Sequence, residues 1–348
     1  MISATMNART FIDDTVHGCV DVHTHVVPHD FPAYAGRHVD ARWPSMTAAR
    51  PCHRHVMLQG SVYRTVTHQA WDPAVRIEDM GRTGVQRQVL SPMPELLSYW
   101  LDPDDGAAMC RFLNETIAGM VAASPSAFFG LGAVPLQDPD RAVAELEHAI
   151  RSLGLSGVEI GSNVNGVAIG DPRFRPFFAA ACQLGAAVFV HPLRPSGMDR
   201  LIGPPIYEQA LAFPGEIGLA AISMMTGGTL AALPQLRIAF SHGGGSLQVL
   251  VPRLQQAWER LAPVKDALAE PPHDTVRRMY YDDLLYDATA IESLVRLAGP
   301  DRVMVGTDYP FNIMDREPES RIQSLALDEE TKRALRFRNA LRWLGAGT

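Results

Sequence analysis

The chain contains 348 residues, of which 47% are hydrophobic and 20% are charged, and its net charge is −7 with His neutral. This composition supplies a large core and excludes a disordered chain or a small disulfide-stapled protein. An acidic chain is a poor candidate for binding nucleic acid, although a local cationic pocket can still bind a small anion. Four scattered cysteines without a CxxC pair are typical of a reducing compartment, so we expect a cytoplasmic protein.

The chain contains no segment that we expect to enter a membrane. The N-terminus, MISATMNARTFIDD, lacks the apolar core of a signal peptide. Two uncharged stretches, 176–193 and 217–236, are interrupted by Gly, Gln and Pro residues. We expect each to be a buried helix that leads into a buried strand.

Short apolar runs alternate with longer amphipathic runs along the chain. The apolar runs predict strands at 19–23, 85–91, 128–134, 155–160, 186–191, 236–241, 279–282 and 302–307. The amphipathic runs predict helices at 73–83, 105–123, 138–153, 172–184, 215–231, 246–262, 287–298 and 329–343. Asp138 and Pro139 are typical of a helix start. Gly154 and Gly185 stand where the end of a helix favours left-handed backbone.

Eight strands that alternate with eight helices favour a (β/α)₈ TIM barrel, because continuous apolar strands suit a parallel sheet that is covered on both faces. A doubly wound open sheet has the same alternation, and periodicity does not separate the two. The segment at about 29–70 is rich in His, Arg and Pro, and we expect a small insertion there, over the barrel mouth. Since no linker or repeat is present, we expect residues 1–348 to form a single domain.

Two histidines follow the first predicted strand in the motif Asp21-Val22-His23-Thr24-His25. Alternate residues of a strand point to the same side, so His23 and His25 can project together. A pair of neutral imidazoles suits Zn, Fe or Co. Alone, an H-x-H motif is weak, because an isolated histidine is more often a surface or hydrogen-bonded residue than a ligand.

The same context recurs at three later strand ends. His191 closes an apolar run, His242 follows Phe240-Ser241 and opens three glycines, and Asp308 follows Gly306-Thr307. The carboxyl ends of parallel barrel strands meet at one face, where active sites are built. The recurrence therefore predicts a metal site at that face rather than a set of unrelated polar residues.

The motifs DVHTH, HPL, SHGGG and GTDYPF together resemble the amidohydrolase superfamily. Within it, the chain is most similar to the α-amino-β-carboxymuconate-ε-semialdehyde decarboxylase (ACMSD)-like family. The similarity runs from about residue 19 to 343 and includes AWDPAVRIEDMGRTGVQRQVLSPMP, AVPLQDPDRAVAEL, SHGGGSLQVLVPRLQQAW and GPDRVMVGTDYPF.

The resemblance implies one divalent metal ion, usually zinc, and roles for single residues around it. The residues that match the family's metal ligands are His23, His25, His191 and Asp308. His242 matches a histidine beside the metal-bound water that acts as acid/base, and Asp308 joins His242 in the catalytic set. Such a ligand set keeps the metal electrophilic, with an open position for water or substrate.

The resemblance also implies a substrate pocket. Arg64 and Arg253 match arginines that bind substrate carboxylates, and Phe311 matches an aromatic residue of the pocket wall. In the family the second arginine comes from the neighbouring subunit, which implies a homodimer with Arg253 reaching the neighbouring site. Arg194, shortly after His191, is a further candidate for binding an anion. Two arginines fit a dicarboxylate, because each guanidinium can bind a carboxylate bidentately.

The implied reaction is non-oxidative decarboxylation of an unsaturated or aromatic carboxylic acid. A metal-dependent hydrolase or hydratase of a lactone or an unsaturated dicarboxylate would use the same site, and CO₂ release against water uptake separates the two. A third interpretation is an inactive metal protein that binds small acids or a partner. The loop 194–208 has fewer aromatic residues than we expect of ACMSD itself, which leaves the substrate open. Glu159 ends the fourth predicted strand, where we expect a salt-bridge or pocket residue rather than a ligand.

Overall fold

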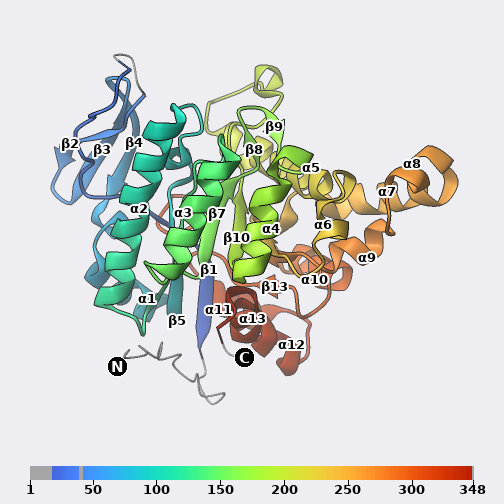
Figure 1. Ribbon diagram of the computed structural model, residues 1–348. Helices are drawn as coiled ribbons and strands as arrows, with labels where there is room; N and C mark the ends of the chain where they lie inside the picture. The colour runs from blue at the N-terminus through green and yellow to red at the C-terminus, as the bar shows by residue number, and fades with distance from the viewer. Residues whose placement is uncertain (1–17, 39–41, 347–348) are drawn as a thin grey trace, which may run out of the picture.

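The computed structural model describes residues 18–38 and 42–346 (Figure 1). The N-terminal stretch in which we expect no signal peptide lies outside the described residues. Within these two ranges, none of the helices has both the length and the apolar character needed to cross a membrane.

Eight parallel strands form one sheet in the order β1-β5-β6-β7-β10-β11-β12-β13. Backbone hydrogen bonds of 2.8 Å from Val22 N to Val305 O and 2.7 Å from His25 N to Tyr309 O join the first strand to the segment after the last. The sheet therefore closes on itself, and the predicted (β/α)₈ barrel is confirmed. The strands are β1 (Cys19–Val26), β5 (Val85–Pro92), β6 (Phe128–Gly132), β7 (Gly157–Gly161), β10 (Ala187–His191), β11 (Arg237–Phe240), β12 (Tyr280–Asp282) and β13 (Val303–Met304).

Helices connect successive strands and cover the outside of the barrel (Figure 1). The predicted start of the third helix is confirmed, because the Asp138 carboxylate accepts a hydrogen bond from Arg141 N and Pro139 occupies the first turn. Gly185 ends its helix with the expected left-handed backbone, at φ +60°. The helices are α1 (Pro73–Thr83), α2 (Pro103–Ala123), α3 (Pro139–Arg151), α4 (Arg175–Leu184), α5 (Phe213–Thr226), α6 (Thr229–Ala232), α7 (Leu247–Arg260), α8 (Ala262–Ala267), α9 (Pro272–Val276), α10 (Ala288–Ala298), α11 (Pro318–Ser324), α12 (Glu329–Arg333) and α13 (Asn339–Leu344).

An insertion interrupts the barrel between β1 and α1, as predicted. It forms a three-stranded antiparallel sheet of β2 (Ser45–Arg50), β3 (His53–Leu58) and β4 (Ser61–Thr67). Figure 1 shows this sheet at the upper left. A second, two-stranded ribbon of β8 (Asn163–Val164) and β9 (Val167–Ala168) follows β7.

The buried strands pack on both faces, which places alternate side chains in different layers. Val188 and Val190 of β10 join an apolar cluster with helix residues such as Phe177. Ala187 and Phe189 join a second cluster that contains residues of the other barrel strands. His191 continues the alternation of Ala187 and Phe189, so its ring points into the barrel.

Candidate active site

Four predicted metal-ligating side chains meet at the carboxyl ends of the strands. His23 and His25 lie on β1, His191 is the last residue of β10, and Asp308 lies in the turn after β13. One donor atom from each of the four lies within 4.8 Å of the donor atoms of the other three, and all four residues are buried. Residues separated by almost the whole chain are thus brought into one cluster, as the strand-end pattern predicts.

The donor atoms of the four side chains face one another at short distances. His23 Nε2 lies 3.1 Å from His25 Nε2. Asp308 Oδ1 lies 3.4 Å from His23 Nε2 and 3.1 Å from His25 Nε2. His191 Nε2 is buried and has no hydrogen-bond partner among the described residues. Buried polar atoms are normally paired, and three imidazoles with one carboxylate suit a divalent cation, so the arrangement is a divalent metal site.

The turn that carries Asp308 is fixed against β1. Asp21 accepts hydrogen bonds from His23 N at 3.2 Å, from Thr307 N at 3.0 Å and from Thr307 Oγ1 at 2.6 Å. Asp308 N in turn donates to His23 O at 2.9 Å. Gly306 permits this close approach, because an added Cβ there would lie 2.9 Å from His23 Cβ. The position of Asp308 therefore depends on β1 as much as on its own strand.

The carboxylate of Asp282, the last residue of β12, also supports the cluster. Its Oδ2 lies 2.7 Å from His23 Nδ1, and both side chains are fully buried. Sequence reasoning missed Asp282, although it carries the same signal as the other site residues, a polar side chain at the end of an apolar strand.

Burial lowers the pKa of His191 well below the ordinary value of histidine, and the nearby rings of His25 and His23 lower it further. Burial is also the main reason for the lowered pKa of His25. Burial alone would lower the pKa of His23, but its hydrogen bond to Asp282 and the nearby carboxylates raise that pKa to about 9. A bound cation would take the place of the extra proton, since an imidazole ligates in its neutral form.

His242 lies beside the metal cluster. Its ring centroid lies 5.3 Å from that of His23 and 5.4 Å from that of His191. Burial and the neighbouring His23 lower the pKa of His242 to about 4. The Nδ1 atom of His242 lies 3.2 Å from Ser241 Oγ, and within the described part of the chain Nε2 has no hydrogen-bond partner.

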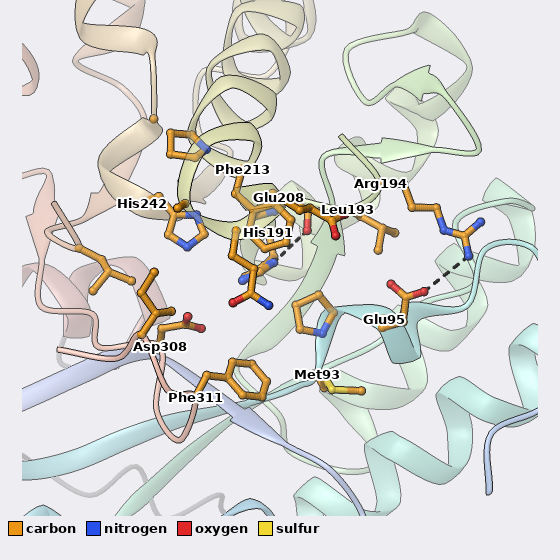
Figure 2. Close-up of a pocket in the computed structure, with 18 of the residues that line it drawn as sticks. Met93, Glu95, His191, Leu193, Arg194, Glu208, Phe213, His242, Asp308 and Phe311 are labelled. Carbon is orange, nitrogen blue, oxygen red and sulfur yellow. Dashed lines mark hydrogen bonds and ion pairs between the residues drawn. The ribbon is translucent and has the colours of Figure 1, made fainter. Parts of the chain in front are cut away.

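A cavity of about 240 Å³ opens directly over this cluster. Figure 2 shows His191, His242 and Asp308 converging on it from different elements, with Phe311 and Met93 on another side. Sequence reasoning missed several lining residues that lie outside the barrel strands and their main helices, among them Tyr63, Glu95, Glu208 and Tyr286.

Arg64 and Phe311 lie together on the cavity wall. The guanidinium carbon of Arg64, on β4, lies 4.3 Å from the centroid of the Phe311 ring. The same Phe311 ring stacks on His25, with centroids 5.1 Å apart. The insertion therefore brings a cation to the edge of the metal cluster.

Arg194 also lines the cavity, but other residues already hold it. Its guanidinium lies 3.5 Å from Glu95 Oε1 and 4.1 Å from the centroid of the Trp100 ring (Figure 2 shows the pair with Glu95). Its charge is thus balanced within the pocket wall.

Arg253 lies on α7 and is exposed, and it is not one of the described residues that line this cavity. Glu159, the third residue of β7, is fully buried and lies 3.8 Å from His25 Nδ1. Its carboxyl oxygens have no hydrogen-bond partner among the described residues, and burial raises its pKa to about 8. It lies outside the cluster of four donor atoms.

The fold and the site agree with three comparisons. The family model described as Amidohydrolase matches residues 20–346. A 2-amino-3-carboxymuconate-6-semialdehyde decarboxylase of Dictyostelium discoideum is 37% identical over 94% of this chain and 91% of its own length. A gamma-resorcylate decarboxylase of Rhizobium radiobacter is 28% identical over 74% of this chain and 82% of its own length.

A solved structure has the same architecture. The 5-carboxyvanillate decarboxylase of Sphingomonas paucimobilis superposes with a TM-score of 0.74 at 27% identity, over 80% of this chain and 85% of that one. The match of the family model covers nearly the whole chain, and the metal cluster lies where the family's strand-end motifs predict it. The chain therefore belongs to the amidohydrolase family, among its ACMSD-like members.

Proposed function

We propose that this protein is a metal-dependent carboxy-lyase, which removes CO₂ from an unsaturated or aromatic carboxylic acid without oxidation. The observation that carries the proposal is that His242 and Arg64 line the same cavity as His191 and Asp308, which belong to the cluster of four ligand side chains. The relatives named above are decarboxylases of such acids, which supports the same reaction class.

His23, His25, His191 and Asp308 would hold the metal, and we propose zinc, which accepts imidazole and carboxylate ligands in tetrahedral sites. When bound, the metal would supply Lewis-acid polarisation of an oxygen of the substrate or of water. Metal analysis of the purified protein tests its identity. Manganese or iron in place of zinc would contradict this part of the proposal.

The side chains that line the cavity would bind the substrate and supply the proton. Arg64 would bind a substrate carboxylate through its guanidinium, and Phe311 would pack against the conjugated part of the molecule. Decarboxylation breaks the bond to the carboxyl carbon and leaves its electron pair in the conjugated system, until a proton replaces the departing CO₂. His242 Nε2 has no hydrogen-bond partner among the described residues, so it would accept a proton from a water molecule and pass it to the carbon that loses CO₂.

The reaction is tested by measuring CO₂ release from 2-amino-3-carboxymuconate-6-semialdehyde and from salicylate-type acids. We expect CO₂ in an amount equal to the acid consumed, and no turnover by a His242→Ala variant that still binds metal. Uptake of water without CO₂ would refute the proposal and favour a hydrolase or hydratase.

We also propose that the protein is a homodimer in which Arg253 reaches the neighbouring cavity. Arg253 is exposed on α7, and Val249, one helical turn earlier, is 72% exposed. An exposed apolar residue next to an exposed cation is consistent with an interface. Mixing an inactive Arg253→Ala variant with an inactive His242→Ala variant should restore part of the activity, because a mixed dimer contains one complete site. No recovery would refute the shared site.

Finally, we propose that residues 1–348 act as one domain in the cytoplasm. The cysteines in the described residues, Cys19, Cys52, Cys110 and Cys182, are all free thiols, as a reducing compartment favours. Fractionation of the native host cells tests the location.

A further inference from the structure

One buried carboxylate is bonded to both functional parts of the site. Asp282 Oδ2 lies 2.7 Å from Nδ1 of the metal ligand His23. Asp282 Oδ1 accepts hydrogen bonds from Gly243 N at 2.7 Å and from Leu284 N at 3.2 Å. Gly243 directly follows His242 in the chain. We propose that Asp282 is a positioning residue, which orients His23 toward the metal and holds the turn that carries His242.

Asp282 fixes the tautomer of His23. A carboxylate only accepts hydrogen bonds, so the bond to Asp282 places a proton on His23 Nδ1 and leaves Nε2 free. Nε2 is also the atom that faces the cluster, at 3.1 Å from His25 Nε2 and 3.4 Å from Asp308 Oδ1. Carboxylate partners of this kind fix the ring orientation of metal-ligating histidines.

Asp282 also restrains the backbone next to His242. Both His242 and Gly243 have left-handed backbone, with φ of +52° and +59°. A non-glycine residue in this region is strained and persists only where its surroundings hold it. The bond from Gly243 N to Asp282 is such a restraint, because it ties the turn to the end of β12. The His242 ring then lies 5.3 Å from the His23 ring, whose orientation depends on the same carboxylate.

The neighbouring Asp283 offers a matched control. It is also buried at the end of β12, and its Oδ1 accepts a hydrogen bond from Gly306 N at 3.0 Å. Its side chain has no hydrogen bond with any of the four ligands or with His242 among the described residues. Asp283→Asn therefore replaces a buried carboxyl group next to Asp282 without changing the contacts of His23.

The first test is the metal affinity of Asp282→Asn and Asp283→Asn, measured by competition with a chelator. Gly243 N and His23 Nδ1 face different oxygens of Asp282, and an Asn at 282 has a single side-chain oxygen, so it cannot accept at both positions. If it keeps the Gly243 bond, its NH₂ group faces His23 Nδ1 and favours the tautomer with a proton on Nε2. We expect Asp282→Asn to lose roughly 10–100-fold in zinc affinity. Asp283→Asn should stay within about threefold of the unchanged protein, by the same scale.

The second test separates positioning from general damage. At saturating zinc, Asp282→Asn should lose roughly tenfold or more in kcat while KM stays nearly constant, because the bond to Gly243 positions His242 rather than the substrate. A variant with unchanged zinc affinity, or with equal losses in Asp283→Asn, would overturn the proposal.

If Asp282→Asn does not fold, the tautomer of His23 can be tested in the unchanged, metal-loaded protein. Nitrogen-15 NMR of the histidine rings, assigned with a His23→Gln variant, should show His23 protonated on Nδ1. A His23 ring protonated on Nε2 would overturn the proposal. The role of Asp282 rests on the metal site of the proposed function but not on the reaction. The zinc affinity of the variants and the tautomer of His23 therefore test it even if none of the acids is decarboxylated.

Discussion

Arg64 offers a sharp test of how the cavity recognises its substrate. It is half-buried at the cavity wall, and no carboxylate of the described residues lies within 4.0 Å of its guanidinium, which packs instead on Phe311. A hydrogen bond between charged partners contributes about 1.5–3 kcal/mol. Arg64→Met keeps an apolar stem over Phe311 but removes this bond, so we expect a loss of roughly 10–150-fold in kcat/KM.

Arg194→Met is the matched control, because Arg194 lines the same cavity but is already paired with Glu95 and stacked on Trp100. Half-exposed ion pairs contribute about 0.2–1 kcal/mol, so its loss should lower kcat/KM by less than about fivefold. Steady-state CO₂ release under equal metal loading measures both variants. An effect of Arg194→Met as large as that of Arg64→Met would refute the assignment of Arg64 as the free carboxylate-binding group.

Three further changes test the site and its support. His191→Ala removes a buried ligand, so the protein should lose its bound metal in elemental analysis while retaining its circular dichroism spectrum; full metal content would contradict the ligand set. Gly306→Ala would bring a Cβ within 2.7 Å of Asp282 Cβ, and overpacking of this kind costs about 1–3 kcal/mol, which urea unfolding should detect; unchanged stability would show that the turn can shift freely. Burial raises the pKa of Asp283 well above its ordinary value, so the folded protein binds this proton more tightly than the unfolded chain. Stability should therefore fall as pH rises above the ordinary range of Asp, and Asp283→Asn should reduce that slope; an identical slope would rule the group out.

Much of the barrel is predictable, because continuous apolar runs and capped amphipathic helices are local signals. The predicted strand 186–191 and helix 138–153 lie close to β10 and α3. The strand predicted at 302–307 is shorter in the structure: only Val303 and Met304 pair with β12, and residues 305–309 bond to β1. The pairing of β2 to β4 was not predictable, since antiparallel register depends on contacts that no single run of sequence encodes.

The metal cluster is predictable for a topological reason, because parallel strands bring their carboxyl ends to one face. The pairing of Arg194 is not predictable from the sequence. Its partners Glu95 and Trp100 lie about a hundred residues earlier in the chain, and only the fold brings them into contact with it. Asp282 shows another limit of prediction from the sequence. Its position at a strand end is visible in the sequence, but its bond to His23 requires knowledge of which strand lies beside which.

Because residues 305–309 bond to β1, the metal site can form only when both the first strand and the segment after the last strand are present. A ribosome must complete nearly nine-tenths of the sequence before Asp308 exists to meet His23, and the same segment closes the barrel. A fragment that stops short of this turn lacks both the fourth ligand and the last strand contact. Metal uptake during synthesis would therefore mark the moment at which the barrel becomes complete.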